Sequence, residues 1–529
     1  MPHTPHPFVQ HLQRRPGMWA GVIICVTTLV RVWFVATHQL DLVQDEAHYW
    51  DWTRHLQLSY YSKGPLIAYL ISLGTTIFGA TELGVRSMAI AGSAAIQGVV
   101  YWGLAQLWGR PLTALWALLI ANTMLIFMAA GILMTTDNPL LLGWVAGLFL
   151  LYAASTREKE SSRYFWLLAA AVAWGIWAKY TMLVFPLVAL VYSLGVQRQA
   201  MLPRGYWPRL AGALGLGVVL GLVPIVLWNA GHDWVGFRHV LHRGGVESAG
   251  WLEWFDWEEF PEYLGSQIGV LTPWWFVFLL LGAWGALKRL RGPAGVDGMG
   301  LTRRQAWLLN AGFWPVWLFF VFWSLHTHVE ANWSAVSYGA GIVLAALAWQ
   351  RYWERARGRH RKWRVLWPTL GLVLFVLVHA QNLMPLPAEY NPAARLKGWH
   401  DLGAEVHRLQ EEQFVRSNRV FVFSDRYNTT AALSFYVPGQ KRAFCVNTGR
   451  RLNQYDFWPG PVRRYGWDAI YVQKEMGESL EPEVRAMFAR VSERIDYRSQ
   501  HRGAPAQGFS IYLCYGYNGQ WPDPPDKSY

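Results

Sequence analysis

Two adjacent carboxylates, Asp45 and Glu46, follow directly after the first long apolar run of the chain, in the segment Gln44-Asp45-Glu46-Ala47-His48-Tyr49. Carboxylates are costly to place inside lipid and are well suited to proton transfer. A pair of them at a membrane edge therefore favours acid–base chemistry on a substrate that approaches from water. For Asp45, capping of a short helix at the membrane surface is an equally good interpretation of the same residue type.

The composition of the chain is typical of a membrane protein. Its 529 residues are 53% hydrophobic and only 15% charged, and they include 33 Trp. The apolar residues form runs, such as 17–37, that are long enough to cross a ~30 Å hydrocarbon core. The net charge of +13 comes from Lys and Arg in short loops between these runs, which indicates orientation in a bilayer rather than binding of nucleic acid.

The hydropathy pattern predicts eleven membrane helices and an uncleaved first helix. The predicted spans are 17–38, 86–108, 112–133, 139–155, 164–179, 181–196, 209–229, 267–287, 306–325, 333–350 and 365–384. The apolar segment 65–78 is short for a span and contains Ser72, Thr75 and Thr76, so we place it flat against the membrane surface. With this choice the loops on the N-terminal side hold 21 Lys and Arg and the opposite loops hold six, which predicts a cytoplasmic N-terminus.

This topology gathers the unusual polar residues at helix ends on the outer face. They are Asp45, Glu46, Lys63, Asp137, Lys179, His232, Asp233, Glu330 and Asn332. A helical bundle with no function at that face has no reason to concentrate such residues there, so we expect the functional site at the outer edge.

From about residue 385 the composition becomes polar, and no further span appears. Short β-like runs at 419–423, 443–446, 469–472 and 510–515 alternate with helical patterns at 402–412 and 481–495. We therefore expect a transmembrane domain over 1–384 and a small extracytoplasmic α/β domain over 385–529. Cys445 and Cys514 fall in predicted strands, where two buried thiols are favoured over a disulfide.

The residues after the first span carry a family resemblance. The segment 45–52 and the later Tyr60-Tyr61-Ser62-Lys63-Gly64-Pro65-Leu66-Ile67 resemble the polyprenyl-phosphate-dependent glycosyltransferases of the GT-C fold, in particular the bacterial protein O-mannosyltransferase family that includes the lipid A aminoarabinose transferases. The resemblance continues at 136–139, 178–181, 328–333 and 453–458. Gly64 stands where the family motif has a proline, a departure that we expect to loosen the turn after Lys63.

The resemblance implies roles for the acidic residues. Asp45 matches the position of the catalytic base, which would accept the proton of the attacking hydroxyl. Glu46 either orients the acceptor, sits against a cation or faces solvent. Asp137 matches a second acidic position near the site, although the Asp-Asn-Pro sequence is also typical of a turn.

The cationic and other polar residues are expected to bind the substrates. Lys63 and Lys179, with Arg238 and Arg243 as further candidates, would stabilise the departing lipid phosphate. For the two lysines, the alternative is that they simply reach from helix ends towards the interface. Contacts with substrate are expected from a second group, Tyr61, His328, Glu330 and Asn332, where simple capping is the alternative. We expect no required cofactor and no dedicated metal site, although Asp45, Glu46 and Asp137 leave a divalent cation open.

These expectations together predict an inverting glycosyltransferase of the inner membrane. It would move one sugar from a polyprenyl phosphate, such as undecaprenyl phosphate, to a lipid A, glycan, lipid or protein acceptor at the outer face, without nucleic acid. The main alternative is a lipid or solute transporter or flippase. Transporters place ionisable residues near the bilayer midplane between internal repeats, and neither feature is apparent in the sequence. A scaffold that has lost its activity is a third interpretation.

Overall fold

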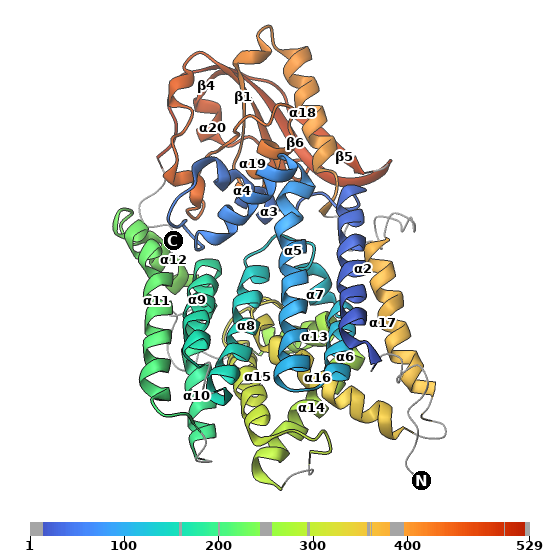
Figure 1. Ribbon diagram of the computed structural model, residues 1–529. Coiled ribbons are helices and arrows are strands. Elements are labelled where there is room, and N and C mark those ends of the chain that lie inside the picture. The colour runs from blue at the N-terminus through green and yellow to red at the C-terminus, as the bar shows by residue number, and fades with distance from the viewer. Residues whose placement is uncertain are drawn as a thin grey trace.

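A helical bundle carries a mixed β-sheet at one end (Figure 1). The computed structural model describes residues 14–157, 161–198, 202–243, 257–293, 297–356, 360, 362–380, 396–501 and 503–523. The bundle helices are α2 (Pro16–Ala36), α5 (Glu82–Tyr101), α6 (Pro111–Asn122), α7 (Leu125–Ala130), α8 (Asp137–Thr156), α9 (Ser161–Ala178), α10 (Phe185–Gln197), α11 (Tyr206–Ala230), α13 (Glu259–Leu271), α14 (Pro273–Arg291), α15 (Arg303–Trp323), α16 (Tyr338–Arg355) and α17 (Trp363–His379).

The chain is a multi-pass membrane protein, but the predicted number of spans is not confirmed. Six helices in the described part of the chain are long and apolar enough to cross a membrane, and a bent pair raises this number to seven. Several predicted spans are built differently from the expected single helix. The span expected over 112–133 is interrupted between α6 and α7 at Thr123 and Met124, and α17 is a shorter apolar helix of 17 residues.

The span expected over 267–287 contains a sharp bend. The axes of α13 and α14 differ by 99°. Thr272 stands between them with φ of +66°, a conformation that is strained for a residue with a side chain. Pro273 begins α14, and a proline disfavours helical backbone at the residue before it. The local sequence therefore ends one helix at Leu271 and starts the next in another direction.

The loop after α2 folds into short helices that lie between the bundle and the sheet. They are α3 (Gln44–Trp52), the 3₁₀ turn η1 (Thr53–His55) and α4 (Leu66–Phe78). At 13 residues, α4 is too short to be a typical span, as the sequence predicted. It packs against α3 and α5 and lies at the sheet end of the bundle (Figure 1). This arrangement keeps Asp45 and Lys63, which flank the same loop, at one end of the molecule.

The C-terminal region forms a six-stranded sheet with helices on it. Its elements are α18 (Trp399–Gln413), β1 (Val420–Ser424), α19 (Tyr427–Tyr436), β2 (Phe444–Cys445), η11 (Gln454–Phe457), β3 (Asp468–Lys474), α20 (Pro482–Ala486), β4 (Phe488–Val491), β5 (Ile495–His501) and β6 (Ala504–Tyr517). The strand order is β2-β1-β3-β6-β4, with β5 also paired to β6. The pairs of β1 with β2 and β3 are parallel, and β6 runs antiparallel to its neighbours.

The helix predicted over 481–495 is wrong over most of its length. Only α20 is helical, and the remainder contains β4 and the first residue of β5, because both strands pair with β6. The cysteines follow the favoured interpretation: Cys445 and Cys514 are free and buried. They lie on β2 and β6 with β1 and β3 between them, so at about 4.8 Å per strand their backbones are much too far apart for a disulfide.

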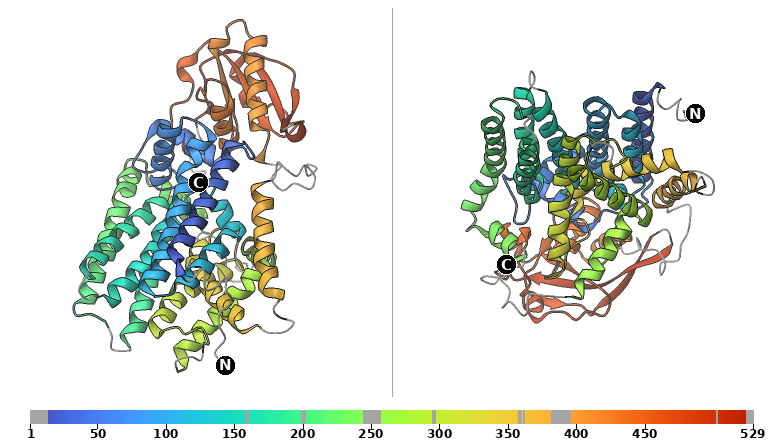
Figure 2. Two further views of the ribbon diagram at one scale, coloured as in Figure 1. Left: turned by 45° about the vertical axis from the view of Figure 1, so that its right-hand side comes forward. Right: turned by 90° about the horizontal axis from the view of Figure 1, so that it is seen from below.

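One hydrophobic core joins the sheet to the loop helices. Trp399 of α18 and Ile470 of β3 belong to the same buried cluster as Ala47 of α3 and Ile71 of α4. The sheet therefore lies directly on the loop after α2, and the left view in Figure 2 shows it at this end of the bundle. The predicted domain boundary at 384/385 lies outside the described residues.

Candidate active site

A cavity of about 680 Å³ lies where the loops at the end of the bundle meet the sheet region. Seven of the residues singled out in the sequence line it: Asp45, Tyr61, Lys63, Asp137, Lys179, Glu330 and Asn332. They come from four separate loops of the bundle, and the fold brings them to one site.

The two adjacent carboxylates of α3 lie in different surroundings. Asp45 lines the cavity, half-buried, and accepts a long hydrogen bond of 3.4 Å from the hydroxyl of Tyr427. Glu46 is fully buried and does not line the cavity. Successive residues on a helix point about 100° apart, so the two side chains diverge.

Glu46 belongs to a buried ion pair. Its carboxylate accepts from Arg86 Nη2 at 2.6 Å and from the backbone amides of Val43 and Met134 at 2.9 and 2.8 Å. Arg86 is also fully buried. Of the three roles considered for Glu46, the geometry matches the one in which its carboxylate pairs with a cation, here Arg86. Its place outside the cavity contradicts the expected catalytic role, because its oxygen atoms are already occupied by protein donors.

Asp137 holds two other cavity residues in place. It begins α8, where a negative charge is favourable at the positive end of the helix dipole. Its Oδ1 accepts from Lys179 Nζ at 2.7 Å, and its Oδ2 accepts from Asn332 Nδ2 at 2.6 Å. Both carboxylate oxygens are thus engaged. The ammonium group of Lys179 retains further N–H groups, because it has three and Asp137 takes one.

The turn that carries Lys63 packs tightly against the end of α9. The carbonyl of Lys63 accepts from the backbone amide of Tyr60 at 3.1 Å, which closes the turn. A Cβ atom at Gly64 would lie 2.2 Å from the carbonyl oxygen of Trp177, two residues before Lys179. The glycine therefore permits a close approach of the two backbones instead of loosening the turn, which corrects the expectation from the sequence.

Besides Glu46, two predicted site residues, His328 and Arg238, are not part of the cavity wall in the described structure. His328 is exposed, and a 2.6 Å hydrogen bond with Glu259 raises its pKa. Arg238 and Arg243 lie on α12 (Val235–Arg243), and the side chain of Arg243 is outside the described residues. From this helix His239 lines the cavity, with its ring centroid 4.5 Å from that of Tyr61. The expected substrate and phosphate contacts of His328 and Arg238 are therefore not supported by their positions.

The sheet region supplies cavity residues that the sequence did not single out as site residues: Arg426, Tyr427, Asn428, Arg450 and Arg451. The segment 453–458, which is part of the family resemblance, indicates why these residues of the sheet region reach the cavity. Gln454 lines the cavity and accepts from the backbone amide of Tyr61 at 2.7 Å, so this segment docks on the Lys63 loop. Arg450 is held by Asp456, with Nη1 and Oδ2 2.9 Å apart.

Further polar contacts tie α3 to the sheet region. Asp51 is fully buried, and it accepts from the hydroxyl of Tyr455 at 2.7 Å and pairs with Arg54 at 2.8 Å. Burial raises the pKa of Asp51 against the opposing effect of these partners. His48 lines the cavity one turn after Asp45 and is almost fully buried. Burial, together with the charge of Arg450, lowers the pKa of His48 to about 3, so its imidazole is neutral at pH 7.

The charge on the cavity wall favours an anionic ligand. Five Lys and Arg side chains line the cavity among the described residues, against three Asp and Glu. Asp137 is already paired with Lys179. A concave site with an excess of cations is suited to phosphate groups, and Asp45 is an acidic group at the same wall.

The known proteins that the chain resembles are described as glycosyltransferases. Residues 62–228 match the family described as dolichyl-phosphate-mannose-protein mannosyltransferase. The lipid A galacturonosyltransferase RgtD of Rhizobium johnstonii is 26% identical over 346 residues, which cover 64% of this chain and 66% of that protein. The undecaprenyl phosphate-alpha-4-amino-4-deoxy-L-arabinose arabinosyl transferase of Pseudomonas aeruginosa is 28% identical over 276 residues, which cover 50% of this chain and 46% of that protein. The chain thus matches between about half and two thirds of the length of these relatives.

Two solved structures share the fold over nearly the whole chain. ArnT from Cupriavidus metallidurans in the apo state is 16% identical with a TM-score of 0.57, and the match covers 94% of this chain and 98% of ArnT. The same protein bound to undecaprenyl phosphate is 17% identical with the same TM-score, over 93% and 98%.

The fold is that of the membrane glycosyltransferases of the GT-C type with a sheet region at one end. Within that class the chain is similar to the lipid A galacturonosyltransferase RgtD and to the undecaprenyl phosphate-aminoarabinose transferases.

Proposed function

We propose that the protein transfers a single sugar from undecaprenyl phosphate to a lipid acceptor. The observation that carries this proposal is the large cavity, which is lined by the half-buried carboxylate of Asp45 and by the side chains of Lys63 and Lys179. The names of the relatives support it, because they describe transfer to lipid A and use of an undecaprenyl-phosphate sugar. The structural neighbour bound to undecaprenyl phosphate supports the lipid donor.

The proposed reaction is a single displacement at the anomeric carbon. An acceptor oxygen attacks that carbon, and Asp45 accepts its proton as general base, a role that contributes typically about 10²–10⁴ in rate. The bond between the anomeric carbon and the phosphate oxygen breaks, and the lipid phosphate leaves with the electron pair. Lys179, positioned by Asp137, and Lys63 would stabilise the charge on the departing phosphate. Attack from the opposite side inverts the anomeric configuration.

The proposed setting is the inner membrane, with the N-terminus in the cytoplasm and the sheet region on the outer side. The excess of Lys and Arg in the loops at the end of the bundle opposite the sheet supports this orientation. The cations contributed by Arg426, Arg450 and Arg451 lie on the sheet side of the cavity. An acceptor that carries phosphate would meet them there, so we favour a lipid acceptor over a glycan or protein.

The proposal makes no use of a metal ion. Both carboxylate oxygens of Asp137 are engaged by Lys179 and Asn332, and Glu46 is engaged by Arg86. Two of the three acidic residues considered for a divalent cation are therefore occupied by protein donors. Activity that persists in excess EDTA is expected, and activity restored only by a divalent cation would contradict this part of the proposal.

The test is transfer of a labelled sugar by the purified full-length protein. A panel of radiolabelled undecaprenyl-phosphate sugars is incubated with lipid A and with inner-membrane lipids, and the labelled product is extracted and identified. Asp45→Asn is expected to reduce transfer by at least about 100-fold while retaining donor binding. Asp523→Asn makes the same chemical change at an exposed position of the sheet region and serves as the matched control.

Two results would overturn the proposal. Full activity of Asp45→Asn would remove Asp45 as the base. Movement of labelled lipid across liposomes with no new covalent product, for every donor in the panel, would favour a transporter instead.

A further inference from the structure

A fully buried arginine within the bundle has unused hydrogen-bond donors. Arg31 of α2 is 1% exposed. Its Nη2 donates to Asn122 Oδ1 at 2.7 Å. Its Nε and Nη1 have no hydrogen-bond partner, and no carboxylate pairs with it anywhere in the described residues. The guanidinium therefore carries a charge that its described neighbours do not neutralise.

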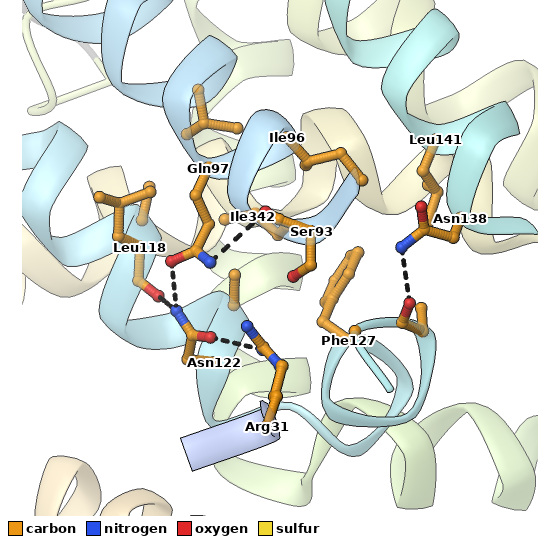
Figure 3. Close-up of a pocket in the computed structure, with 15 residues that line it drawn as sticks. Arg31, Ser93, Ile96, Gln97, Leu118, Asn122, Phe127, Asn138, Leu141 and Ile342 are labelled. Carbon is orange, nitrogen blue, oxygen red and sulfur yellow. Dashed lines mark hydrogen bonds between the residues drawn. The ribbon is translucent and has the colours of Figure 1, made fainter. Parts of the chain in front are cut away.

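The neighbouring polar groups are already used for other bonds. Asn122 Nδ2 donates to Gln97 Oε1 and to the carbonyl of Leu118, both at 2.8 Å (Figure 3). Gln97 Nε2 in turn donates to the carbonyl of Ser93 at 3.4 Å. This neutral network fixes Asn122 against Arg31 but supplies no negative charge.

A small cavity lies beside the guanidinium. Its volume is about 30 Å³, and it is lined by Arg31, Ser93, Gln97, Asn122, Asn138 and apolar side chains. In Figure 3 the side chains of Ser93 and Arg31 point towards one another. A Cβ atom at Gly131 would lie 2.5 Å from Arg31 Nε, so only glycine leaves this side of the guanidinium clear. The small cavity shares no lining residue with the large cavity described above.

Charge and size together define the ligand. An unpaired charge within a membrane span is costly, and such residues mark functional sites with a partner. A cavity of about 10–15 Å³ already holds one water molecule, so about 30 Å³ admits one or two waters or one monatomic anion and favours these over a phosphate, a sulfate or a carboxylate. A water molecule fits but leaves the positive charge uncompensated.

We propose that this cavity binds a monatomic anion of halide size, with chloride as the ligand available in solution. The anion accepts hydrogen bonds from Arg31 Nε and Nη1 and from the hydroxyl of Ser93. By compensating Arg31 it stabilises the packing of α2 against α5 and α6, and it does so whatever reaction takes place in the large cavity.

The test compares halides with larger anions on the purified full-length protein. Thermal unfolding is followed in sodium gluconate, sulfate, chloride and bromide at equal ionic strength. Chloride and bromide are expected to raise the Tm by about 2–4 °C over gluconate. Sulfate stabilises proteins in general by exclusion from their surface, so any gain in sulfate should be equal in the wild type and in Arg31→Met. Arg31→Met should abolish the difference between chloride and gluconate. Ser93→Ala, which removes one proposed donor, should weaken the halide response and keep some of it.

A direct measurement remains informative if Arg31→Met fails to fold. Crystals of the wild-type protein grown in bromide are expected to show an anomalous peak beside Arg31 Nε. A peak at that place supports the proposal. Equal Tm values in chloride and gluconate, or density for water alone with no anomalous signal, would overturn it.

Discussion

Lys179 Nζ donates to Asp137 Oδ1 at 2.7 Å, and this ion pair forms part of the wall of the large cavity. The pair is mostly buried, with 16% and 10% of the two side chains exposed. Asn332 occupies the second oxygen of Asp137. Both oxygens of Asp137 are therefore engaged, and we propose that Asp137 positions Lys179 for a ligand in the cavity.

Loss of either Lys179 or Asp137 should therefore impair the same step, which is binding of the lipid-linked donor. Lys179→Met is expected to raise the KM for the lipid-linked donor at least about tenfold, since a charge-assisted hydrogen bond contributes about 1.5–3 kcal/mol. Asp137→Asn should have a similar effect because it frees Lys179 from its position. The double variant should be little worse than either single one, as expected for coupled residues. Initial rates over a range of donor concentrations measure this, and strictly additive losses would contradict the coupling.

The buried pair of Glu46 and Arg86 predicts a loss of stability and not of chemistry. Glu46→Gln leaves Arg86 buried without its counter-charge, which typically costs about 3–5 kcal/mol. We expect a clear fall in the free energy of unfolding in detergent, while kcat per folded molecule stays near the wild-type value. Glu412→Gln breaks an exposed pair with Arg408 and should cause no measurable change. A folded Glu46→Gln protein with kcat reduced 100-fold would restore the catalytic role.

The contact of Gly64 with Trp177 predicts that even a methyl group is not tolerated there. In Gly64→Ala the new Cβ would lie 2.2 Å from the carbonyl oxygen of Trp177, so the Lys63 turn must move away from α9. We expect weaker donor binding and a lower Tm. Gly98→Ala in α5 is the matched control, because no atom lies within 4 Å of the place that its Cβ would occupy and alanine favours a helix. Donor affinity and Tm unchanged in Gly64→Ala would show that the close approach is unimportant.

The depressed pKa of His48 predicts sensitivity to acid. In the unfolded chain His48 titrates near 6.5, whereas in the folded protein its pKa is about 3. Its neutral form therefore contributes stability that is present above pH 6.5 and is lost as the pH falls towards 3. At pH 5 the loss amounts to about 2 kcal/mol. Unfolding curves of the wild type and His48→Asn between pH 8 and 5 should converge as the pH falls, and parallel curves would contradict the assignment.

The site was predictable from the sequence where membrane geometry constrained it. Asp45, Lys63, Asp137 and Lys179 flank apolar segments, and the loop charges place all four at one end of the bundle. The fold confirms that they line one cavity. The shortness of 65–78 likewise identified α4 as a helix outside the set of long spans.

Other features depend on tertiary contacts that no local pattern encodes. Asp45 and Glu46 are adjacent residues of the same chemical type. Only the position of Arg86 on α5 determines that Glu46 forms a buried ion pair whereas Asp45 lines the cavity. Arg450 reaches the cavity because the segment with Gln454 docks on a loop nearly 400 positions earlier. The segment 481–495 has a helical pattern, but pairing with β6 overrides it.

The docking of residues 426–454 on the first loop has a consequence for biosynthesis. Asp45 leaves the ribosome about 400 residues before Arg450 and Gln454, yet all three line the same cavity. An incomplete nascent chain therefore holds its acidic and cationic groups at an open membrane surface. The compartment that surrounds them forms only after residues 426–454 have been made, so a product that ends before them would have the helices of the bundle without the enclosed cavity.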